Sequence, residues 1–187
     1  MKKIKYAVIG YGNRGRGYTS YCLKHKDEYE VVAVIEKNEE RLNKVEIEGC
    51  KLFTSLDDFM NEKIECDIVC VATQDQEHYL ASIKLLTNGY NLLLEKPISN
   101  KLDECLKIEE IAKKYNRKVI VCHVLRYTIF YHKIKELILD NEVGKIINIQ
   151  TQENIGYWHM AHSYVRGPWK NKETSSPIIL AKCCHDL

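Results

Sequence analysis

A glycine-rich turn between an apolar segment and an amphipathic segment constrains this chain most. Residues 4–9 are mostly apolar and favour a strand, and the sequence Gly10-Tyr11-Gly12-Asn13-Arg14-Gly15 follows them directly. An amphipathic segment from about Gly15 to Lys26 favours a helix, and the valine-rich residues 30–35 favour a second strand. This order predicts a β-α-β unit whose first turn is built from glycines.

Each glycine of this turn has a physical role in a dinucleotide site. Gly10 permits the tight turn, Gly12 lets the backbone approach a pyrophosphate, and Gly15 lets the helix pack close to the strand. The start of the helix adds N–H groups and a partial positive charge. The alternative is a glycine-rich turn that binds no nucleotide, because glycines occur in many turns. The strand, helix and acidic residue around the motif favour the dinucleotide site.

The acidic residue Glu36 ends the second expected strand, 21 residues after Gly15. A carboxylate at this place can accept hydrogen bonds from both hydroxyls of the adenosine ribose, and it repels a 2′-phosphate. The sequence therefore predicts NAD as the cofactor, with NADP less favoured. Lys37 opposes this preference, because its ammonium group can reach a phosphate.

Strands and helices keep alternating along the first two-thirds of the chain. Apolar segments favour strands at residues 51–53, 67–72, 91–94 and 118–122, and helices are expected at residues 38–45, 76–87 and from Asn100 to about residue 115. Ser55 and Asp58 have capping-box spacing and predict the start of a further short helix. This order predicts an α/β fold with a doubly wound parallel sheet.

The pattern changes after residue 124, where we place a domain boundary. Apolar residues at helical spacing favour a helix over residues 127–138, and alternating residues predict a long strand from Lys145 to Ile155. Residues 158–174 have no clear period, and Pro177 predicts the first position of another helix. Because one strand cannot form a sheet, we expect residues 125–187 to be the incomplete start of a second α/β domain or to pack on a partner chain.

Composition argues against several kinds of partner. Lys and Arg number 28 and Asp and Glu 26, so a net charge of +2 gives no long-range attraction to nucleic acid or to an anionic membrane. No apolar segment approaches the ~20 residues of a membrane helix. The apolar segment after Met1-Lys2-Lys3 is shorter than the ~7 residues that a signal peptide needs. We therefore expect a cytoplasmic protein without a nucleic-acid or membrane partner.

The eight cysteines favour neither disulfides nor a metal site. Cys66 and Cys70 lie in an apolar segment, where reduced cysteine is a common small core residue. Cys183, Cys184 and His185 are neighbours, and neighbouring residues of a helix point in different directions. His159 and His162 have the spacing of helical ligands, but a third ligand is not evident. We therefore expect no metal site.

Three segments together carry a family resemblance: residues 7–12 (AVIGYG), residues 69–73 with His78 five residues on, and Leu94-Glu95-Lys96-Pro97, the most specific of them. They resemble the Gfo/Idh/MocA oxidoreductases, the relatives of glucose–fructose oxidoreductase and inositol dehydrogenase. The resemblance implies a Rossmann domain at residues 1–124 and the truncated start of a substrate and dimerisation domain at residues 125–187. It also implies hydride transfer between nicotinamide and a carbon of a sugar, polyol or sugar derivative, in a homo-oligomer when the chain is full length.

The resemblance also implies the catalytic residues. Lys96 would lie near the nicotinamide, where an ammonium group stabilises charge on the reacting oxygen. His185 would accept the hydroxyl proton of the substrate. Many members have Asp four residues before this His, where this chain has Ala181, so we expect Lys182 to replace the lost group. The alternatives are a solvated Lys96 and a His185 that only packs in its helix.

Further candidates fall into a cofactor group and a substrate group. The expected cofactor-binding residues are Gly10, Tyr11, Gly12, Asn13, Arg14, Gly15, Glu36, Thr73, His78 and Glu95. The expected substrate-binding residues are Arg126, Tyr157, His159, His162, Arg166 and Trp169. Aromatic rings stack on sugar faces, and His and Arg bind hydroxyls or carboxylates. The alternative for the second group is an irregular loop that packs its aromatic residues inward.

Two other functions stay open. The missing Asp is compatible with a module that binds NAD without turnover. Some relatives use the hydride step only transiently, to cleave a glycoside by elimination, so that no net oxidation results.

Overall fold

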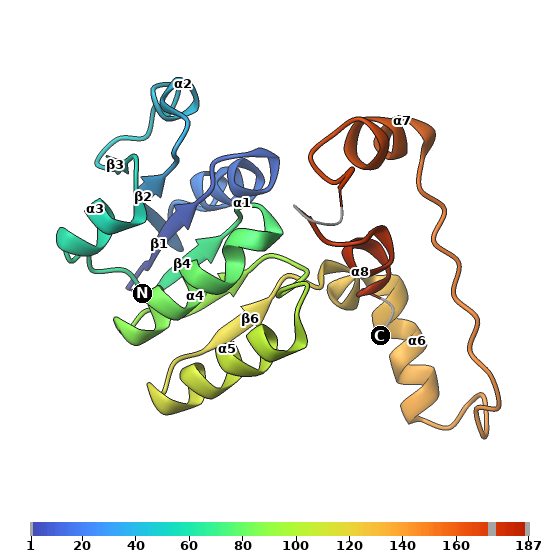
Figure 1. Cartoon of the computed structure of the whole chain (residues 1–187). Coiled ribbons are helices and arrows are strands. Elements are labelled where there is room, and N and C mark those ends of the chain that lie inside the picture. Colours follow the sequence, from blue (N-terminus) through green and yellow to red (C-terminus); the bar gives the residue numbers. More distant parts are fainter. Residues whose placement is uncertain (1, 172–174, 186–187) are drawn as a thin grey trace. The chain divides into compact units, whose positions relative to one another are not determined.

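The computed structural model of the chain describes residues 2–171 and 175–185. It divides into two compact units, residues 1–121 and residues 122–187, which we call the N-terminal unit and the C-terminal unit. Both are drawn in Figure 1. Residues 186 and 187, part of the region where a helix was expected, lie outside the described residues.

The N-terminal unit is built around a six-stranded sheet with the order β3-β2-β1-β4-β5-β6. All neighbouring strands are parallel, which confirms the predicted doubly wound sheet. The chain first builds outward from β1 to β3 and then returns to place β4 on the other side of β1. Such a reversal opens a crevice at the carboxyl ends of the strands. The strands are β1 (Ile4–Ile9), β2 (Tyr29–Ile35), β3 (Lys51–Phe53), β4 (Ile68–Val71), β5 (Leu92–Leu94) and β6 (Val119–Val121).

The helices of this unit begin close to where the sequence predicts them. Ser55 accepts a hydrogen bond from the backbone N–H of Asp58 at 3.1 Å, which confirms the predicted cap. The first helix begins before Gly15, the second ends before residue 45, and Lys101 rather than Asn100 precedes the last one. The helices are α1 (Asn13–Lys24), α2 (Glu39–Leu42), α3 (Leu56–Asn61), α4 (His78–Thr87) and α5 (Leu102–Lys114), with a 3₁₀ turn, η1, at Asp75–Glu77.

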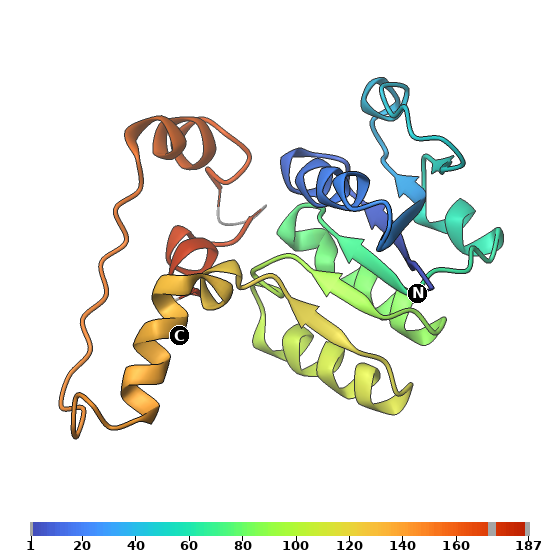
Figure 2. The same cartoon turned by 180° about the vertical axis from the view of Figure 1, so that it is seen from behind.

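The sheet separates two apolar cores, because successive side chains of a strand point to opposite faces. Ala7 and Ile9 of β1 pack with side chains of α3, α4 and α5 on one face. Tyr6 and Val8 pack with Cys22 of α1 and with α2 on the other face. Figures 1 and 2 show the two faces from opposite sides. Residues 7–9 of β1 and residues 69–71 of β4 are therefore apolar and buried at successive positions, as expected of a parallel sheet covered on both faces.

The C-terminal unit is mostly helical in the part that the structure describes. It contains a 3₁₀ turn, η2 (Val124–Tyr127), then α6 (Ile129–Leu139), α7 (Tyr157–His159), a π-helical turn, η3 (Met160–Val165), and α8 (Ile178–Cys183). Thr128 caps α6, and Asn141 and Gly144 follow this helix with positive φ angles. The predicted helix is therefore confirmed as α6.

Three predictions for this unit are wrong. Residues 145–155 form no strand; their backbone pairs with no described strand, and nearly all of them are exposed. A strand requires a neighbour for its backbone hydrogen bonds, so alternation alone does not produce one. Pro177 precedes α8 instead of beginning it, and α8 ends at Cys183, so that His185 lies beyond the helix.

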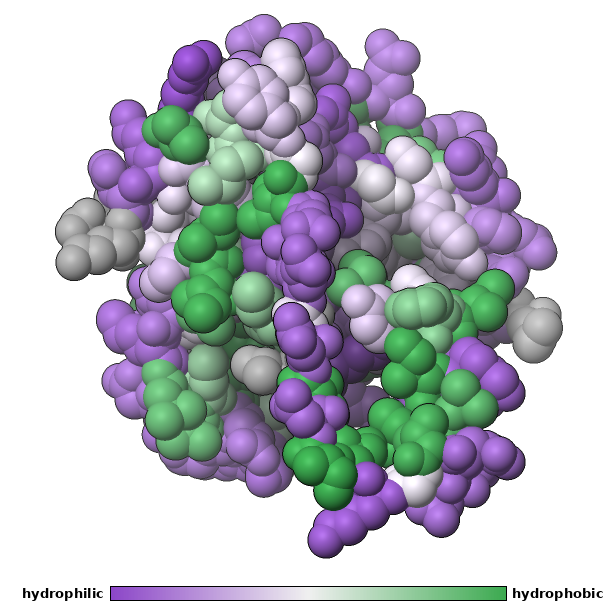
Figure 3. Space-filling view, turned by 90° about the vertical axis from the view of Figure 1, so that its right-hand side faces the viewer, coloured by the Kyte–Doolittle hydropathy of each residue, from purple (hydrophilic) through white to green (hydrophobic). Residues whose placement is uncertain are grey.

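Apolar side chains of the C-terminal unit remain largely exposed. Ile129 is 91% exposed and Phe130 is 68% exposed on α6, and Ile147 is 85% exposed in the following segment. Green hydrophobic side chains reach the surface over this part of the chain in Figure 3. Among the described residues, no helix is both long enough and apolar enough to cross a bilayer.

Candidate dinucleotide-binding site

The glycine turn lies between β1 and α1, and its three glycines differ in their surroundings. Gly10 has a φ of +88°, and a Cβ there would lie 2.6 Å from the carbonyl oxygen of Ala72. A Cβ on Gly15 would lie 2.0 Å from the carbonyl oxygen of Gly10. A Cβ on Gly12 would meet nothing within 4 Å. The first and third glycines therefore close the turn against the protein, whereas the second leaves its outer side open to a ligand.

The start of α1 favours an anion. Gly12 caps the helix without a side-chain hydrogen bond, and the first turn carries no acidic residue. Asn13 accepts a hydrogen bond from Arg16 at 2.8 Å, and Arg14 places its Nε 3.7 Å from Glu95. Backbone N–H groups at such a helix start, together with the helix dipole, bind phosphate groups.

Glu36 follows β2 and is buried, with 5% of its surface exposed. Its Oε2 accepts a hydrogen bond from the backbone N–H of Tyr11 at 2.8 Å, and its Oε1 accepts one from that of Asn38 at 2.9 Å. The guanidinium of Arg41 lies 3.9 Å from Oε2. Each carboxylate oxygen has a second lone pair, so the carboxylate is fixed in place and can still accept hydrogen bonds from a ligand.

A cavity of about 330 Å³ lies along these residues. Its walls come from the glycine turn, from the ends of β2 and β4, and from the residues before α3 and α4. Thr73 lines it with a buried hydroxyl that has no hydrogen-bond partner among the described residues. Buried hydroxyls normally have partners, so this atom indicates a polar ligand. The open side of Gly12 and the Thr73 hydroxyl both fit a dinucleotide.

Glu95 and Lys96 follow β5. The Glu95 carboxylate is 6% exposed and accepts hydrogen bonds from the Tyr18 hydroxyl at 2.6 Å and from the backbone N–H of Lys96 at 3.0 Å. The peptide bond between Lys96 and Pro97 is cis. Tyr18 has no local sequence signal for this role, because its partner is 77 residues away along the chain.

His78 is the first residue of α4 and is 1% exposed. Its Nδ1 lies 2.9 Å from the carbonyl oxygen of Pro97, and its Nε2 lies 3.3 Å from that of Thr73. A neutral imidazole carries one N–H and donates to one of these carbonyls at a time. The ring thus connects the segment after β4 with the segment after β5, and His78 does not line the cavity.

The candidate substrate residues all belong to the C-terminal unit. His159 Nδ1 lies 3.1 Å from the Ser163 hydroxyl oxygen. The ring centroids of His162 and Trp158 are 3.7 Å apart. The ring centroids of Trp169 and Tyr164 are 6.3 Å apart. The structure places Arg126 in η2, Tyr157 and His159 on α7, His162 in the π-helical turn, and Arg166 and Trp169 just after it.

The candidate proton acceptor His185 lies two residues beyond α8. Its ring centroid is 5.9 Å from that of His123 in an edge-on arrangement. Ala181 is 2% exposed, and Lys182 lies in the last turn of the helix. The expectation that His185 lies on this helix is therefore wrong, because α8 is shorter than its sequence suggests.

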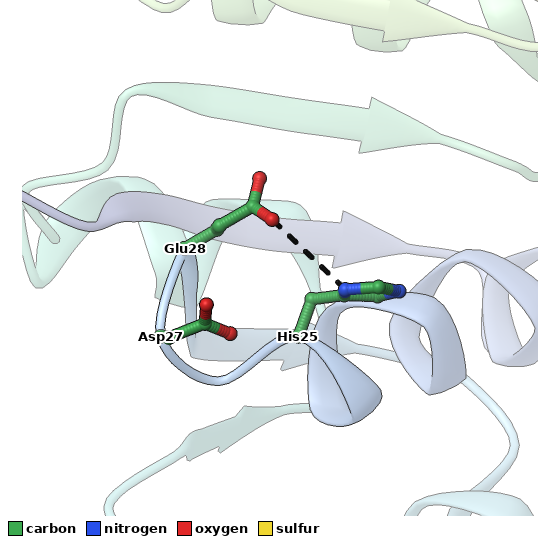
Figure 4. A group of neighbouring side chains, drawn as sticks. All are labelled: His25, Asp27 and Glu28. Carbon is green, nitrogen blue, oxygen red and sulfur yellow. Dashed lines mark ion pairs between the residues drawn. The ribbon is translucent and has the colours of Figure 1, made fainter.

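One group of possible metal ligands lies away from the cavity. His25, Asp27 and Glu28 lie in the turn between α1 and β2, with ligand atoms within 4.8 Å of one another (Figure 4). His25 and Glu28 form an ion pair of 4.0 Å. This turn precedes β2, at the opposite edge of the sheet from the glycine turn, and an exposed ion pair such as that of His25 and Glu28 is common on protein surfaces.

Comparisons with known proteins agree with this geometry. The sequence model of the family described as an oxidoreductase family with an NAD-binding Rossmann fold, Gfo/Idh/MocA, matches residues 4–123. An uncharacterized oxidoreductase of Streptococcus pneumoniae is 28% identical over 151 residues, which are 81% of this chain and 40% of the relative.

Many solved structures resemble the chain, among them two with a bound nicotinamide cofactor. The WlbA dehydrogenase of Chromobacterium violaceum, in complex with NADH and UDP-GlcNAcA, has a TM-score of 0.73 and 25% identity, and the match covers 78% of this chain and 42% of that one. The scyllo-inositol dehydrogenase of Lactobacillus casei, with bound NAD(H) and scyllo-inositol, has a TM-score of 0.82 and 21% identity over 99% of this chain and 54% of that one.

The chain spans less than two thirds of the length of each of these proteins. The match to the family model, by contrast, covers almost the whole N-terminal unit, including the glycine turn, Glu36 and Lys96. This chain belongs to the Gfo/Idh/MocA family of oxidoreductases, and residues 4–123 form its NAD-binding Rossmann domain.

Proposed function

We propose that this chain binds NAD in the cavity beside the glycine turn and acts in hydride transfer to or from a sugar, polyol or sugar derivative. The observation that carries the proposal is the glycine turn, open only at Gly12, next to the fixed carboxylate of Glu36. The named relatives support the substrate class, because one was solved with UDP-GlcNAcA and another with scyllo-inositol.

The cofactor contacts follow from the chemistry of the cavity. Gly12 and the N–H groups at the start of α1 would hold the pyrophosphate. Glu36 would accept hydrogen bonds from the hydroxyls of the adenosine ribose, and Thr73 would offer its hydroxyl to the cofactor. The other cofactor-binding residues of the glycine turn would be Tyr11, Asn13 and Arg14. When bound, the nicotinamide ring of NAD supplies the hydride acceptor.

Lys96 would polarise the reacting C–O bond, because an ammonium group stabilises negative charge that develops on oxygen. Glu95, held by Tyr18, would orient Lys96 through its backbone N–H. His185 would take up the proton of the substrate hydroxyl, with Lys182 beside it as the second charged group. His78 would act on the cofactor indirectly, by fixing the segments that carry Thr73 and Lys96.

The C-terminal unit would provide the substrate contacts. Tyr157 and Trp169 offer ring faces to a sugar, and Arg126 and Arg166 offer guanidinium groups to hydroxyls or carboxylates. His159 and His162 add hydrogen-bonding groups between them. The residues after 124 would form a separate substrate domain, and the protein would act in the cytoplasm as a homo-oligomer.

A second candidate function is an NAD-binding module without turnover. It is favoured by one observation: the buried Ala181 replaces the Asp that the resemblance leads us to expect four residues before His185. Without a carboxylate there, no acidic group at that position would hold the imidazole or raise its basicity. A transient hydride step without net oxidation is a third outcome.

The test has two stages. Titration calorimetry with NADH is expected to give a Kd of about 1–100 μM, in the range of ordinary cofactor binding. NADH formation is then followed with a panel of polyols, inositols and sugar derivatives. Lys96→Ala is expected to reduce turnover about 100-fold or more, whereas Lys107→Ala, an exposed lysine on α5, leaves it unchanged.

The outcomes separate the candidates. Failure to bind NADH contradicts the whole proposal. Binding of NADH without turnover of any substrate supports the non-catalytic module. Product formation without accumulation of NADH supports the transient step. Equal turnover by Lys96→Ala and the wild type contradicts the assignment of Lys96.

A further inference from the structure

We infer that Glu77 controls which nicotinamide dinucleotide the cavity accepts, because it holds the Lys37 ammonium in an ion pair and so withholds it from a 2′-phosphate. This inference rests on the proposed function, since it concerns the adenosine end of the same cavity. It assigns a role in specificity to a residue that makes none of the expected contacts with the pyrophosphate or the ribose.

The ion pair joins two sides of the crevice. Lys37 directly follows Glu36 after β2, and Glu77 ends the 3₁₀ turn η1 after β4. Strand β1 lies between β2 and β4 in the sheet, so the pair spans the carboxyl end of β1. Lys37 Nζ donates a hydrogen bond to Glu77 Oε1, and both residues line the cavity.

The charges at this end of the cavity are balanced. The lining contains the carboxylates of Glu36 and Glu77 and the cations of Lys37 and Arg41. Arg41 lies 3.9 Å from the buried Glu36, and Lys37 is paired with Glu77. Each cation is therefore already matched by a carboxylate. A 2′-phosphate would bring close to two further negative charges into a site without a surplus of positive charge.

Removing the Glu77 charge changes this balance. The three remaining charged side chains, Glu36, Lys37 and Arg41, would then sum to one positive charge, and the Lys37 ammonium would be released to bind a phosphate oxygen. A hydrogen bond between an ammonium group and a phosphate is about twice as strong as one between neutral groups. Glu36 would still repel the phosphate, so we expect a shift in preference toward NADP and not a complete exchange.

The same residues are suited to mutation. The side chain of Lys37 is 74% exposed and that of Glu77 is 37% exposed, so neither belongs to an apolar core. Exposed ion pairs of this kind contribute little to stability. Glu77→Gln keeps the size and hydrogen-bonding shape of the side chain and removes only its charge, and the fold is expected to remain intact.

The experiment measures the Kd of NADH, NADPH, 5′-AMP and 2′,5′-ADP by calorimetry for the wild type and for Glu77→Gln. The last two ligands differ only in the 2′-phosphate and lack nicotinamide, so they report on the adenosine end alone. Wild type is expected to prefer NADH. Glu77→Gln is expected to raise the affinity ratio of NADPH to NADH about tenfold, as one charge-assisted hydrogen bond would, and to shift 2′,5′-ADP against 5′-AMP likewise.

Two matched variants test the cause. Glu40→Gln removes an equal charge from α2, where Glu40 pairs with Lys44 outside the cavity, and is expected to leave the ratio unchanged. Lys37→Gln in the Glu77→Gln background is expected to cancel the gain. Thermal unfolding of each variant checks that the fold is retained.

Each outcome decides the inference. If the wild type binds NADH but Glu77→Gln leaves the ratio unchanged, the inference is wrong and the proposed function stands. An equal rise of the NADPH-to-NADH affinity ratio with Glu40→Gln also overturns the inference, because the loss of any negative charge would then explain the result. A wild type that binds neither NADH nor 5′-AMP contradicts the proposed function and the inference together.

Discussion

The hydroxyl of Tyr18 donates a 2.6 Å hydrogen bond to Glu95 and thereby connects the helix after the glycine turn with the segment that carries Lys96. Glu95 is almost fully buried and also accepts a hydrogen bond from the backbone N–H of Lys96. A buried carboxylate is costly unless its oxygens receive hydrogen bonds. Tyr18 therefore stabilises the end of the site at which the proposed chemistry takes place.

Removing this hydroxyl is expected to destabilise the N-terminal unit. Tyr18→Phe leaves the ring in place but deprives a buried carboxylate of a donor, so we expect the free energy of unfolding to fall by about 1–3 kcal/mol. Urea denaturation measures this loss. Tyr21→Phe is the matched control, because Tyr21 lies on the same helix and is 53% exposed. An equal effect of both substitutions would contradict the role of Tyr18.

The different environments of Gly10 and Gly12 predict two different phenotypes. Gly10→Ala forces a Cβ to 2.6 Å from the Ala72 carbonyl at a positive φ, and is expected to destabilise the fold by more than ~1 kcal/mol. Gly12→Ala meets no atom within 4 Å, so stability is retained, but the methyl group occupies the open side of the turn. We expect NADH to bind about tenfold or more weakly to that variant.

Gly17→Ala serves as the control for both glycine variants, since its Cβ also meets nothing within 4 Å and it lies further along α1. Thermal unfolding and NADH titration are carried out on all of these variants. Tight NADH binding by Gly12→Ala would contradict the placement of the pyrophosphate.

The carboxylate of Glu104 stabilises the turn after Lys96, and its contribution to the free energy of unfolding depends on pH. Burial alone raises the pKa of Glu104, but hydrogen bonds from Lys101 and Ser99 outweigh it and hold that pKa below its usual value. Ser99 donates at 2.5 Å and Lys101 at 2.8 Å. With a lowered native pKa, the stabilisation is present above the unfolded pKa of about 4.3 and is lost as pH falls through the native pKa.

Glu104→Gln is therefore expected to lower the free energy of unfolding by about 1 kcal/mol at pH 7, and this difference should shrink toward about pH 3. Chemical denaturation at several pH values measures it. Glu109→Gln is the matched control on the same helix, because Glu109 pairs with Lys113 in solvent and should matter little. A difference that grows as the pH falls would show that the sign is wrong.

Three cysteines are expected to react slowly in the folded protein. Burial raises the pKa of Cys66 to about 12 and the pKa values of Cys22 and Cys50 to about 11. The thiolate is the reactive form, so little of it is present near pH 8. Iodoacetamide labelling followed by peptide mass spectrometry should modify these residues much faster in urea than in buffer. Equal rates in both conditions would contradict the predicted burial.

Local patterns in the sequence predicted the Rossmann part well. The glycine turn, the six apolar segments and the Ser55 cap each have a signal within a few residues, and the structure confirms all three. The strand expected at residues 145–155 failed for a physical reason. Alternation describes one chain segment, whereas a strand depends on a second segment that the pattern does not contain.

Contacts between residues far apart along the chain have no local signal in the sequence. Tyr18 meets Glu95 across 77 residues and Lys37 meets Glu77 across 40, and no periodicity relates the members of either pair. They come together because the sheet order places the ends of β1, β2, β4 and β5 at one edge. The sequence could identify Glu36 from a motif, but its hydrogen bonds to Tyr11 and Asn38 required the folded loop.

The two apolar cores on either side of β1 have an evolutionary consequence. The floor of the cavity is backbone at Gly10 and Ala72, and neighbouring β1 residues are held by packing on both faces, so most substitutions there would unfold the protein. The rim at Lys37 and Glu77 is partly exposed and belongs to neither apolar core. If Glu77 sets the cofactor preference as inferred above, single rim substitutions would change ligand preference while the scaffold stays fixed. Such a division lets one fold serve many substrates and cofactors over the history of a family.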